Sequence, residues 1–298
     1  MTLHIATDRR ANLLGSFWMI AAMAGFAVED TFVKAASQTL PVGQILIIFG
    51  AGGAVVFACI ARLKNETLFN PDVMSRPMLV RVLFEIIGRL FYVLAISLIP
   101  LSAATVILQA TPLVVIAGAA LVFGERIGWR RWTAIFIGFT GVLVILQPGT
   151  DGFSILSVLA VIGTLGFAGR DLASRAAPAS LSASILGVYG FLSVIVAGAA
   201  FSIWQGASFV RPDIQTSFHL LAAVLAGVAA YGCLMTAMRT GEVSAVTPFR
   251  YTRLIFGMAL GVLLFGESLT ASMMIGAGLI VIAGLFILWR SKRVSASG

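Results

Sequence analysis

The sequence is poor in charged residues. Asp, Glu, Lys and Arg make up only 11% of its 298 residues, whereas 59% are apolar, and the mean hydropathy is +1.03. Soluble domains carry about 25% charged residues, so this chain has too little polar surface to cover a water-soluble globule. Disordered and soluble globular classes are excluded, and an integral membrane protein remains.

Cysteine and histidine are scarce as well, with two of each. Cys59 and Cys233 fall within apolar runs without metal-ligand spacing, and we expect them to pack as small apolar side chains. No G-x-S-x-G, H-E-x-x-H or P-loop motif occurs, so a membrane-embedded enzyme is a remote alternative, and no metal or cofactor is expected. A receptor or scaffold is disfavoured because no connection is long enough for an extramembrane domain.

Ten apolar runs have the length that crosses a bilayer, about 20 residues each. They lack the two-residue alternation of barrel strands, and lipid excludes irregular backbone, so all ten are predicted to be helices. The predicted spans are 13–37, 42–61, 77–98, 101–123, 129–147, 152–175, 179–204, 216–239, 243–265 and 270–290.

Lys and Arg are unevenly distributed between the connections. If the N-terminus is inside, thirteen basic residues lie on the inner side and only Arg211 lies on the outer side. This positive-inside pattern predicts a multi-pass protein of the bacterial inner membrane with both termini cytoplasmic. The basic residues that give the net charge of +8 then face anionic lipid headgroups, and no nucleic-acid partner is expected. The inner residues are Arg9, Arg10, Arg62, Lys64, Arg76, Arg126, Arg130, Arg131, Arg175, Arg239, Arg290, Lys292 and Arg293.

The two halves of the sequence resemble each other. Residues 25–36 match residues 166–177 at an offset of 141, with six identities in twelve positions. Ser102-Ala103 aligns with Ser244-Ala245, and Phe123-Gly124-Glu125 with Phe265-Gly266-Glu267, both at an offset of 142. Because each half has five spans, an odd number, the second half enters the membrane from the opposite side. The predicted fold is therefore an all-α membrane protein of ten transmembrane helices in two inverted five-helix repeats, residues 1–148 and 149–298.

With this repeat and the paired Gly-Glu, the whole chain resembles the EamA-type branch of the drug/metabolite transporter superfamily. The resemblance implies a secondary transporter that moves a small-molecule substrate across the membrane by alternating access. That branch includes importers of vitamins and nucleotide-like solutes and exporters of amino acids and metabolites. The first half is similar to its riboflavin importers, so uptake of riboflavin or another vitamin is the first expectation and export of amino acids or related metabolites is the alternative.

Ten charged residues fall inside the predicted spans at least three residues from either end, and each costs roughly 2.5–3.5 kcal/mol at a helix centre unless it is paired or hydrated. Asp30 with Lys34, and Asp171 with Arg175, are four residues apart and are predicted to form repeat-symmetric structural ion pairs within their helices. The six basic and four acidic residues together favour a neutral or anionic solute. Glu29, Glu85 and Asp171 are candidates to balance the arginines or to carry a coupled proton.

Polar residues that break the repeat symmetry are the substrate-binding candidates. Arg81, Glu85, Arg89 and Tyr92 share one helix face, with Arg81 expected to reach the cytoplasmic edge. Guanidinium groups suit a carboxylate, phosphate or imide oxygen, and tyrosines suit a flat solute. The candidate substrate-binding residues are Arg89, Tyr92, Gln109, Arg170, Tyr231, Arg250, Tyr251 and Arg253.

Two prolines are predicted to interrupt the fourth and ninth spans. Pro112 and Pro248 each remove a backbone hydrogen bond, and breaks at comparable places in two halves are typical of a transporter's binding region, although a plain kink is the alternative. Small residues are frequent in the last two spans. They predict close helix approach, within the monomer or at a homodimer seam.

Overall fold

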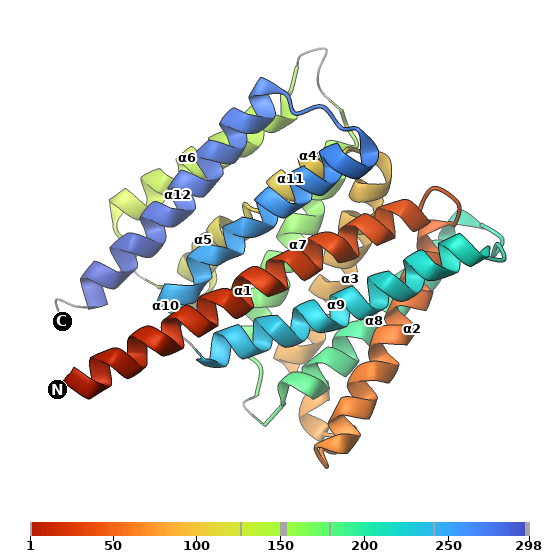
Figure 1. Cartoon of the computed structure of the whole chain (residues 1–298), viewed down its shortest axis with the longest axis horizontal. Coiled ribbons are helices and arrows are strands. Elements are labelled where there is room, and N and C mark those ends of the chain that lie inside the picture. Colours follow the sequence, from red (N-terminus) through yellow and green to blue (C-terminus); the bar gives the residue numbers. More distant parts are fainter. Residues whose placement is uncertain (1, 126, 150–153, 179, 241, 296–298) are drawn as a thin grey trace.

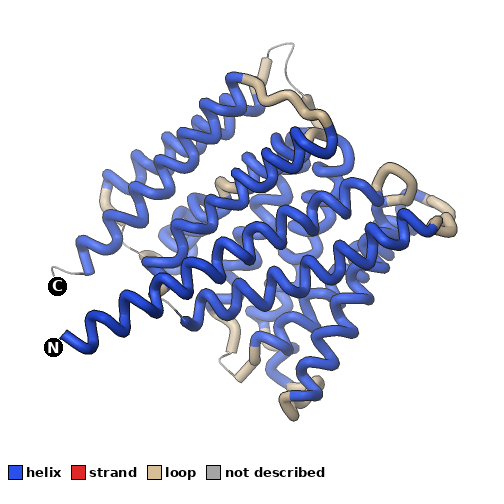
Figure 2. The backbone as a smooth tube through the Cα atoms, viewed as in Figure 1, coloured by secondary structure: helices blue, strands red, loops and turns tan. Residues whose placement is uncertain are grey.

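The protein is seen here in a computed structural model that describes residues 2–125, 127–149, 154–178, 180–240 and 242–295. Within those ranges it consists of helices and loops (Figure 2). Arg126 lies outside the described residues, as do the side chains of Arg9, Lys292 and Arg293. The helices are α1 (Thr2–Ala36), α2 (Val42–Leu63), η1 (Pro71–Met74), α3 (Arg76–Leu98), α4 (Leu101–Leu108), α5 (Thr111–Phe123), α6 (Trp129–Leu146), α7 (Ser157–Arg175), α8 (Ala183–Gln205), α9 (Ile214–Thr240), α10 (Val243–Val246), η2 (Thr247–Tyr251), α11 (Thr252–Phe265) and α12 (Ala271–Ser295).

Each predicted span corresponds to one helix or to one interrupted helix. The span 101–123 consists of α4 and α5, and the span 243–265 consists of α10, η2 and α11. α1 begins well before residue 13, and its apolar part starts at Arg10. A helix of 35 residues is about 52 Å long, so its first turns extend beyond the hydrocarbon layer. The predicted all-α membrane fold is confirmed.

Two helices differ from the rest in composition. Eight helical segments within the described residues are long and apolar enough to cross a membrane, and α3 and α7 are not among them. These two carry the charged residues of the third and sixth spans, and they pack against each other inside the bundle (Figure 1). Each therefore shields the polar face of the other from lipid.

The helix pairs follow the inverted repeat. α4 packs on α11, and these two helices belong to the equivalent fourth and ninth spans. α2 packs on α8 and α6 on α12, and exchanging the two halves maps each of these two pairs onto itself. The same exchange converts the α1–α9 pair into the α7–α3 pair. Both chain termini lie at one end of the bundle, which we call the terminal end, and the opposite end is the distal end (Figure 1). α1 runs from the terminal to the distal end.

The α3–α7 contact depends on glycine. A Cβ atom on Gly88 would lie 2.9 Å from the backbone nitrogen of Phe167, and Gly166 lies directly against the backbone of Gly88. The repeat counterparts of this pair, Gly25 and Ala230, bring α1 against α9 in the same way. Small residues here let the charged helices approach closely.

We expect replacement of Gly166 by Leu to destabilise the protein by about 1–3 kcal/mol, because the added side chain must separate α3 from α7. The measurement is the thermal unfolding midpoint of purified protein in detergent. Gly232→Leu is the matched control, since this helical glycine is exposed and no heavy atom lies within 4 Å of its added Cβ. Equal midpoints for the two variants would contradict the prediction.

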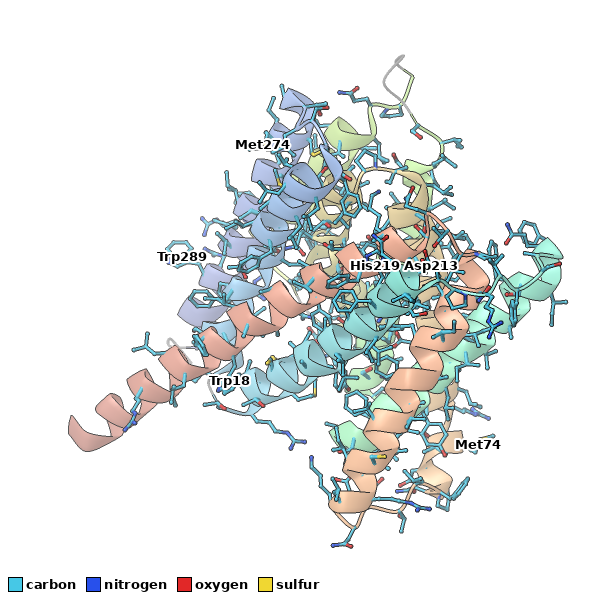
Figure 3. All side chains as sticks on the ribbon, turned by 45° about the vertical axis from the view of Figure 1, so that its right-hand side comes forward. Trp18, Met74, Asp213, His219, Met274 and Trp289 are labelled. Atoms are coloured by element: carbon cyan, nitrogen blue, oxygen red, sulfur yellow. The ribbon has the colours of Figure 1, made fainter. Side chains whose placement is uncertain are left out.

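Large apolar side chains cover the outside of the bundle. Trp18, Met274 and Trp289 point outward in Figure 3 and are 37–52% exposed, as expected of side chains that face lipid. Asp213 and His219 lie near the start of α9 at the distal end (Figure 3). There Thr216 hydrogen-bonds to the carboxylate of Asp213, and this bond holds the pKa of Asp213 below its usual value.

Candidate functional site

The two interrupted spans meet in the interior. α4 ends at Leu108, and α5 begins at Thr111 with Pro112 in its first turn; in the second half, the 3-10 turn η2 contains Pro248. The side-chain amide of Gln109 donates to the backbone oxygen of Arg250 at 3.1 Å. A side chain at the first break therefore donates a hydrogen bond to a backbone oxygen at the second break, where the helix is irregular.

Asp30 lies at the centre of one buried cluster. Its Oδ2 atom accepts from Arg253 Nη2 at 2.6 Å and from the hydroxyl of Tyr92 at 3.0 Å. The guanidinium of Arg253 also stacks over Phe26, with 5.1 Å between its carbon and the ring centroid. The cluster joins α1, α3 and α11, which come from both halves.

Glu29 forms a second buried pair with Arg89, at 2.6 Å between Oε1 and Nη1. Phe49 and Phe167 lie 5.0 and 6.0 Å from the guanidinium carbon of Arg89. The side chain of Glu29 is 1% exposed, and its Oε2 atom has no hydrogen-bond partner among the described residues. This carboxylate thus has one strong partner and one vacant acceptor.

A chain of five charged residues runs from α3 through α7 to η2, and we call it the arginine chain. Arg81 lies 3.9 Å from Glu85, which lies 3.4 Å from Arg170. Arg170 forms a two-donor contact with Asp171, at 2.8 and 3.0 Å, and Asp171 lies 3.9 Å from Arg250. Side-chain exposure rises from 6% at Arg81 to 34% at Arg250. Three guanidiniums against two carboxylates leave one positive charge.

The distal end is closed by a cluster that we call the distal clamp, formed by Lys34, Glu267, Leu101 and Ser102. Glu267 accepts from the backbone N–H groups of Leu101 and Ser102 at 2.6 and 2.9 Å and from the Ser102 hydroxyl at 2.7 Å. Lys34 lies 3.7 Å from Glu267 and also donates to two carbonyl oxygens at the end of α3. The clamp therefore ties α1, α3, α4 and the end of α11 together.

The terminal end carries a different arrangement. Glu125, just after α5, accepts from Arg175 at 3.0 Å. The side chains of Arg175 and Glu125 are 53% and 46% exposed, whereas those of Lys34 and Glu267 are 10% and 7% exposed. The pair at the terminal end is therefore about half exposed, and the distal clamp is buried.

The predicted intrahelical ion pairs were wrong. Asp30 binds Arg253 instead of Lys34, and Asp171 binds Arg170 and Arg250 instead of Arg175. Arg253 on α11 reaches Asp30 at 2.6 Å, and Asp171 is held at 2.8 Å by the adjacent Arg170 of its own helix, with Arg250 of η2 at 3.9 Å. Glu29 and Arg170, which are aligned in the two halves, likewise pair with other residues instead of with each other.

Arg81 was predicted to extend to the cytoplasmic edge, and it does not. It is 5% exposed, and its Nε atom donates to the hydroxyl of Ser174 at 3.0 Å. The partner Glu85 and the hydroxyl on α7 hold the guanidinium inside the bundle. Its Nη1 atom has no hydrogen-bond partner among the described residues.

The predicted tyrosines are divided between several places. Tyr92 belongs to the Asp30 cluster, and the ring of Tyr231 packs edge-on against Phe57 at 5.1 Å. Tyr251 follows Arg250 in η2 and is buried with its ring against Gly284 of α12. Sequence reasoning missed the structural part played by Glu125 and Glu267, although the repeated Phe-Gly-Glu marked both positions.

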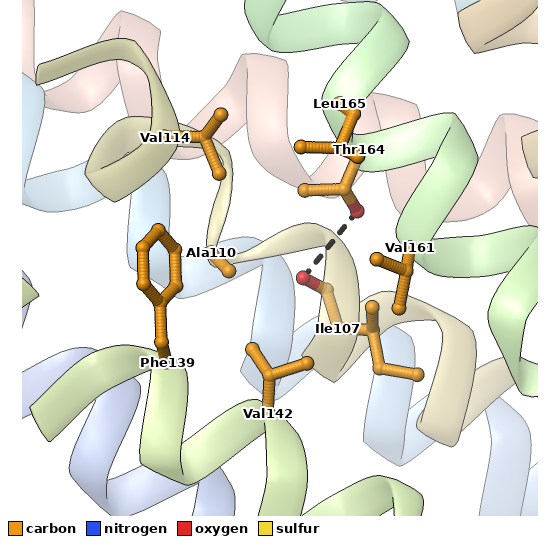
Figure 4. A pocket seen from close by; sticks show the side chains of 8 residues that line it. All are labelled: Ile107, Ala110, Val114, Phe139, Val142, Val161, Thr164 and Leu165. Carbon is orange, nitrogen blue, oxygen red and sulfur yellow. Dashed lines mark hydrogen bonds between the residues drawn. The ribbon is translucent and has the colours of Figure 1, made fainter. Parts of the chain in front are cut away.

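An apolar pocket lies between α4, α5, α6 and α7 (Figure 4). Its one polar lining side chain is Thr164, whose hydroxyl donates to the backbone oxygen of Ala160 at 2.8 Å. A pocket without charge or a free polar group is suited to lipid or apolar side chains rather than to a polar solute. Its lining residues are Ile107, Ala110, Val114, Phe139, Val142, Val161, Thr164 and Leu165.

Inverted five-helix repeats, broken helices that meet in the middle, and buried charges between the halves together define a secondary transporter. The sequence matches the EamA-like transporter family over residues 13–147 and 154–289. The chain belongs to this family, and it is a transporter and not an enzyme.

Several relatives align over nearly the whole chain. It is 27% identical to a riboflavin transporter of Rhizobium johnstonii, with 97% of this chain and 95% of the relative covered. It is 29% identical to a pseudopaline exporter of Pseudomonas aeruginosa, covering 95% and 99%, and 23% identical to an S-adenosylmethionine uptake transporter of Rickettsia prowazekii, covering 97% of each. A solved crystal structure shares the fold, with a TM-score of 0.61, 17% identity, and 96% and 99% coverage.

Proposed function

We propose that the protein moves a small neutral or anionic organic metabolite across the bacterial inner membrane by alternating access. The observation that carries this proposal is the arginine chain, which holds one surplus positive charge and becomes more exposed toward Arg250. Riboflavin or another vitamin, taken up, is the first candidate cargo. The riboflavin transporter of Rhizobium johnstonii supports this choice because the two chains align almost from end to end.

Arg250 is the residue best placed to meet the solute. Its nearest acid, Asp171, is 3.9 Å away at Oδ2, and the Oδ1 atom of Asp171 already accepts two hydrogen bonds from Arg170. Its guanidinium can therefore turn to a carboxylate or imide oxygen without leaving a carboxylate unpaired. In this proposal Arg170 contributes charge from α7, Tyr231 covers a flat part of the solute, and Gln109 holds the backbone of Arg250 in place.

We expect Arg250→Gln to lower kcat/KM for riboflavin uptake about 10- to 100-fold, as loss of a charged hydrogen bond predicts. Arg250→Lys should recover part of that loss, since lysine keeps the positive charge but lacks the planar pair of donors that a guanidinium offers. Arg239→Gln, which removes an exposed arginine at the end of α9, is the control and should transport normally. The measurement is labelled riboflavin flux in vesicles with matched protein amounts. Normal flux in Arg250→Gln would remove Arg250 from the site.

Export of amino acids or related metabolites is the second candidate, supported by the 29% identity to the pseudopaline exporter. Growth complementation separates the two. Rescue of a riboflavin auxotroph that lacks its own importer, at low external riboflavin, supports vitamin uptake. Tolerance of toxic amino-acid analogues by an export-deficient strain supports export instead.

Glu29 is the preferred carrier of a coupled proton among the three candidate carboxylates. Glu85 lies between Arg81 and Arg170, and Asp171 lies between Arg170 and Arg250. Glu29 has a single arginine partner and a vacant Oε2. Its protonation would release Arg89, which is then free to bind a carboxylate or imide oxygen of the solute.

We place the terminal end of the bundle in the cytoplasm, on the basis of the uneven Lys and Arg distribution. Exposed basic residues there would contact anionic headgroups. The two repeats, residues 1–148 and 149–298, would move against each other as units. Gly278, whose added Cβ has no heavy atom within 4 Å, leaves room on α12 for a homodimer seam.

A further inference from the structure

The distal clamp and the Glu125–Arg175 pair are repeat counterparts. Lys34 aligns with Arg175 at an offset of 141, and Glu125 aligns with Glu267 at an offset of 142. Ser102, whose hydroxyl and N–H bind Glu267, aligns with Ser244 at the same offset of 142. One protein thus contains two copies of a basic residue, a glutamate and a serine, one at each end of the bundle.

The two copies are in different states. At the distal end the glutamate is held by three hydrogen bonds and the pair is almost fully buried. At the terminal end both members of the pair are about half exposed. Since the halves are related by an inverted repeat, the difference is that expected between a closed and an open gate of the same construction.

We propose that Glu267 and Glu125 are alternating latches that close the distal and terminal ends in turn. In the present conformation Glu267 locks the distal end while Glu125 is hydrated. In the opposite conformation Glu125 docks against the start of α10, the repeat counterpart of the start of α4, Arg175 becomes buried beside it, and Glu267 releases Ser102. This inference rests on the proposed alternating access.

The exchange has a physical advantage. A buried carboxylate needs charged or hydrogen-bonding partners, so each glutamate can enter the protein only when its end converges on the serine and the basic residue. The hydrogen bonds at one end form while those at the other end are replaced by hydrogen bonds to water. The two conformations therefore differ little in free energy, and a modest preference of the solute for one of them is enough to shift the population.

The repeat is imperfect in a way that favours the observed state. Glu267 lies directly against Gly261, at a position where a Cβ atom would collide with its carboxylate. The counterpart of Gly261 at an offset of 142 is Ala119, which carries that Cβ atom. Glu125 therefore has less room to fold back toward the start of α10, so the terminal latch is the weaker one and the terminal end is open at rest.

The test measures how often the distal end opens, without any solute. Thr105 lies on α4 below the distal clamp and is fully buried, so Thr105→Cys in a protein with Cys59→Ser and Cys233→Ala reports distal opening. The reagent is a membrane-impermeant maleimide added on the distal side of the membrane. We expect Glu267→Gln to accelerate labelling about tenfold and Glu125→Gln to slow it about tenfold.

The double variant Glu125→Gln/Glu267→Gln should label near the parental rate, because both states lose one latch. Glu66→Gln, which removes a carboxylate bound to Ser182 outside the latches, should have no effect. Misfolding accelerates labelling in both single variants, so opposite shifts identify the latches. Shifts of the same sign, or none, overturn the proposal. If the two shifts are opposite in sign but the protein transports no riboflavin, the latch proposal stands and only riboflavin is excluded as the cargo.

Discussion

Asp30→Asn is expected to destabilise the protein by about 3–5 kcal/mol and to abolish solute flux, because it leaves Arg253 charged inside the bundle without its carboxylate partner. The pair is short, at 2.6 Å, and the exposed fractions of its side chains are 2% for Asp30 and 16% for Arg253. Water cannot replace the lost partner at that depth. The measurement is thermal and denaturant unfolding in lipid bicelles, together with riboflavin flux.

Two controls separate charge imbalance from loss of packing. The double variant Asp30→Asn/Arg253→Gln has no uncompensated charge and should recover most of the stability. Glu125→Gln breaks an ion pair that is about half exposed and should cost only about 0–1 kcal/mol. A double variant as unstable as Asp30→Asn alone would show that the size and shape of the aspartate, and not its charge, sustain the cluster.

The span boundaries were predictable because they depend on local properties. Apolar runs must cover about 30 Å of hydrocarbon, and proline marks where a helix begins or is interrupted. The breaks near Pro112 and Pro248 lie within spans whose outer limits the sequence also indicates. The repeat, detected from aligned residues, predicts which helices are equivalent without any knowledge of their packing.

The ion pairs were not predictable in the same way. Spacing along a helix identifies neighbours at four positions, but Glu29 and Arg89 are 60 residues apart, and Asp30 and Arg253 are 223 apart. Such partners are chosen by the rotation of each helix and by contacts such as Gly88 against α7. One sequence without aligned homologues carries no direct signal for either.

The charge balance of the interior also changes when buried residues from the loops are counted. Away from their ends the spans hold six basic and four acidic residues, a surplus of two. Glu267, which follows α11 in a loop, is buried with Lys34 and reduces that surplus to one. A single surplus charge fits a solute with one anionic group better than a polyvalent anion.

Glu29→Gln is expected to make riboflavin uptake independent of external pH, whereas uptake by the unmodified protein should increase as external pH falls. Glutamine resembles a protonated glutamate in size, so the variant mimics the proton-loaded carrier with Arg89 already released. Proton and solute then no longer bind together, and a pH gradient cannot drive accumulation. The measurement is labelled riboflavin uptake into proteoliposomes across a series of external pH values, with exchange of internal for external riboflavin as a second readout.

Glu29→Gln also leaves Arg89 without its carboxylate and should lower stability, so flux is compared at matched amounts of folded protein. Exchange by that folded protein should survive, since it needs only the alternation of an occupied carrier. Glu85→Gln is the matched control: its carboxylate lies between two arginines, so it should impair binding while the remaining uptake still follows pH. Uptake by Glu29→Gln that still rises as pH falls would assign the proton to another group. Loss of exchange together with loss of pH dependence would instead identify the Glu29–Arg89 pair as a structural support, because a proton carrier is dispensable for exchange.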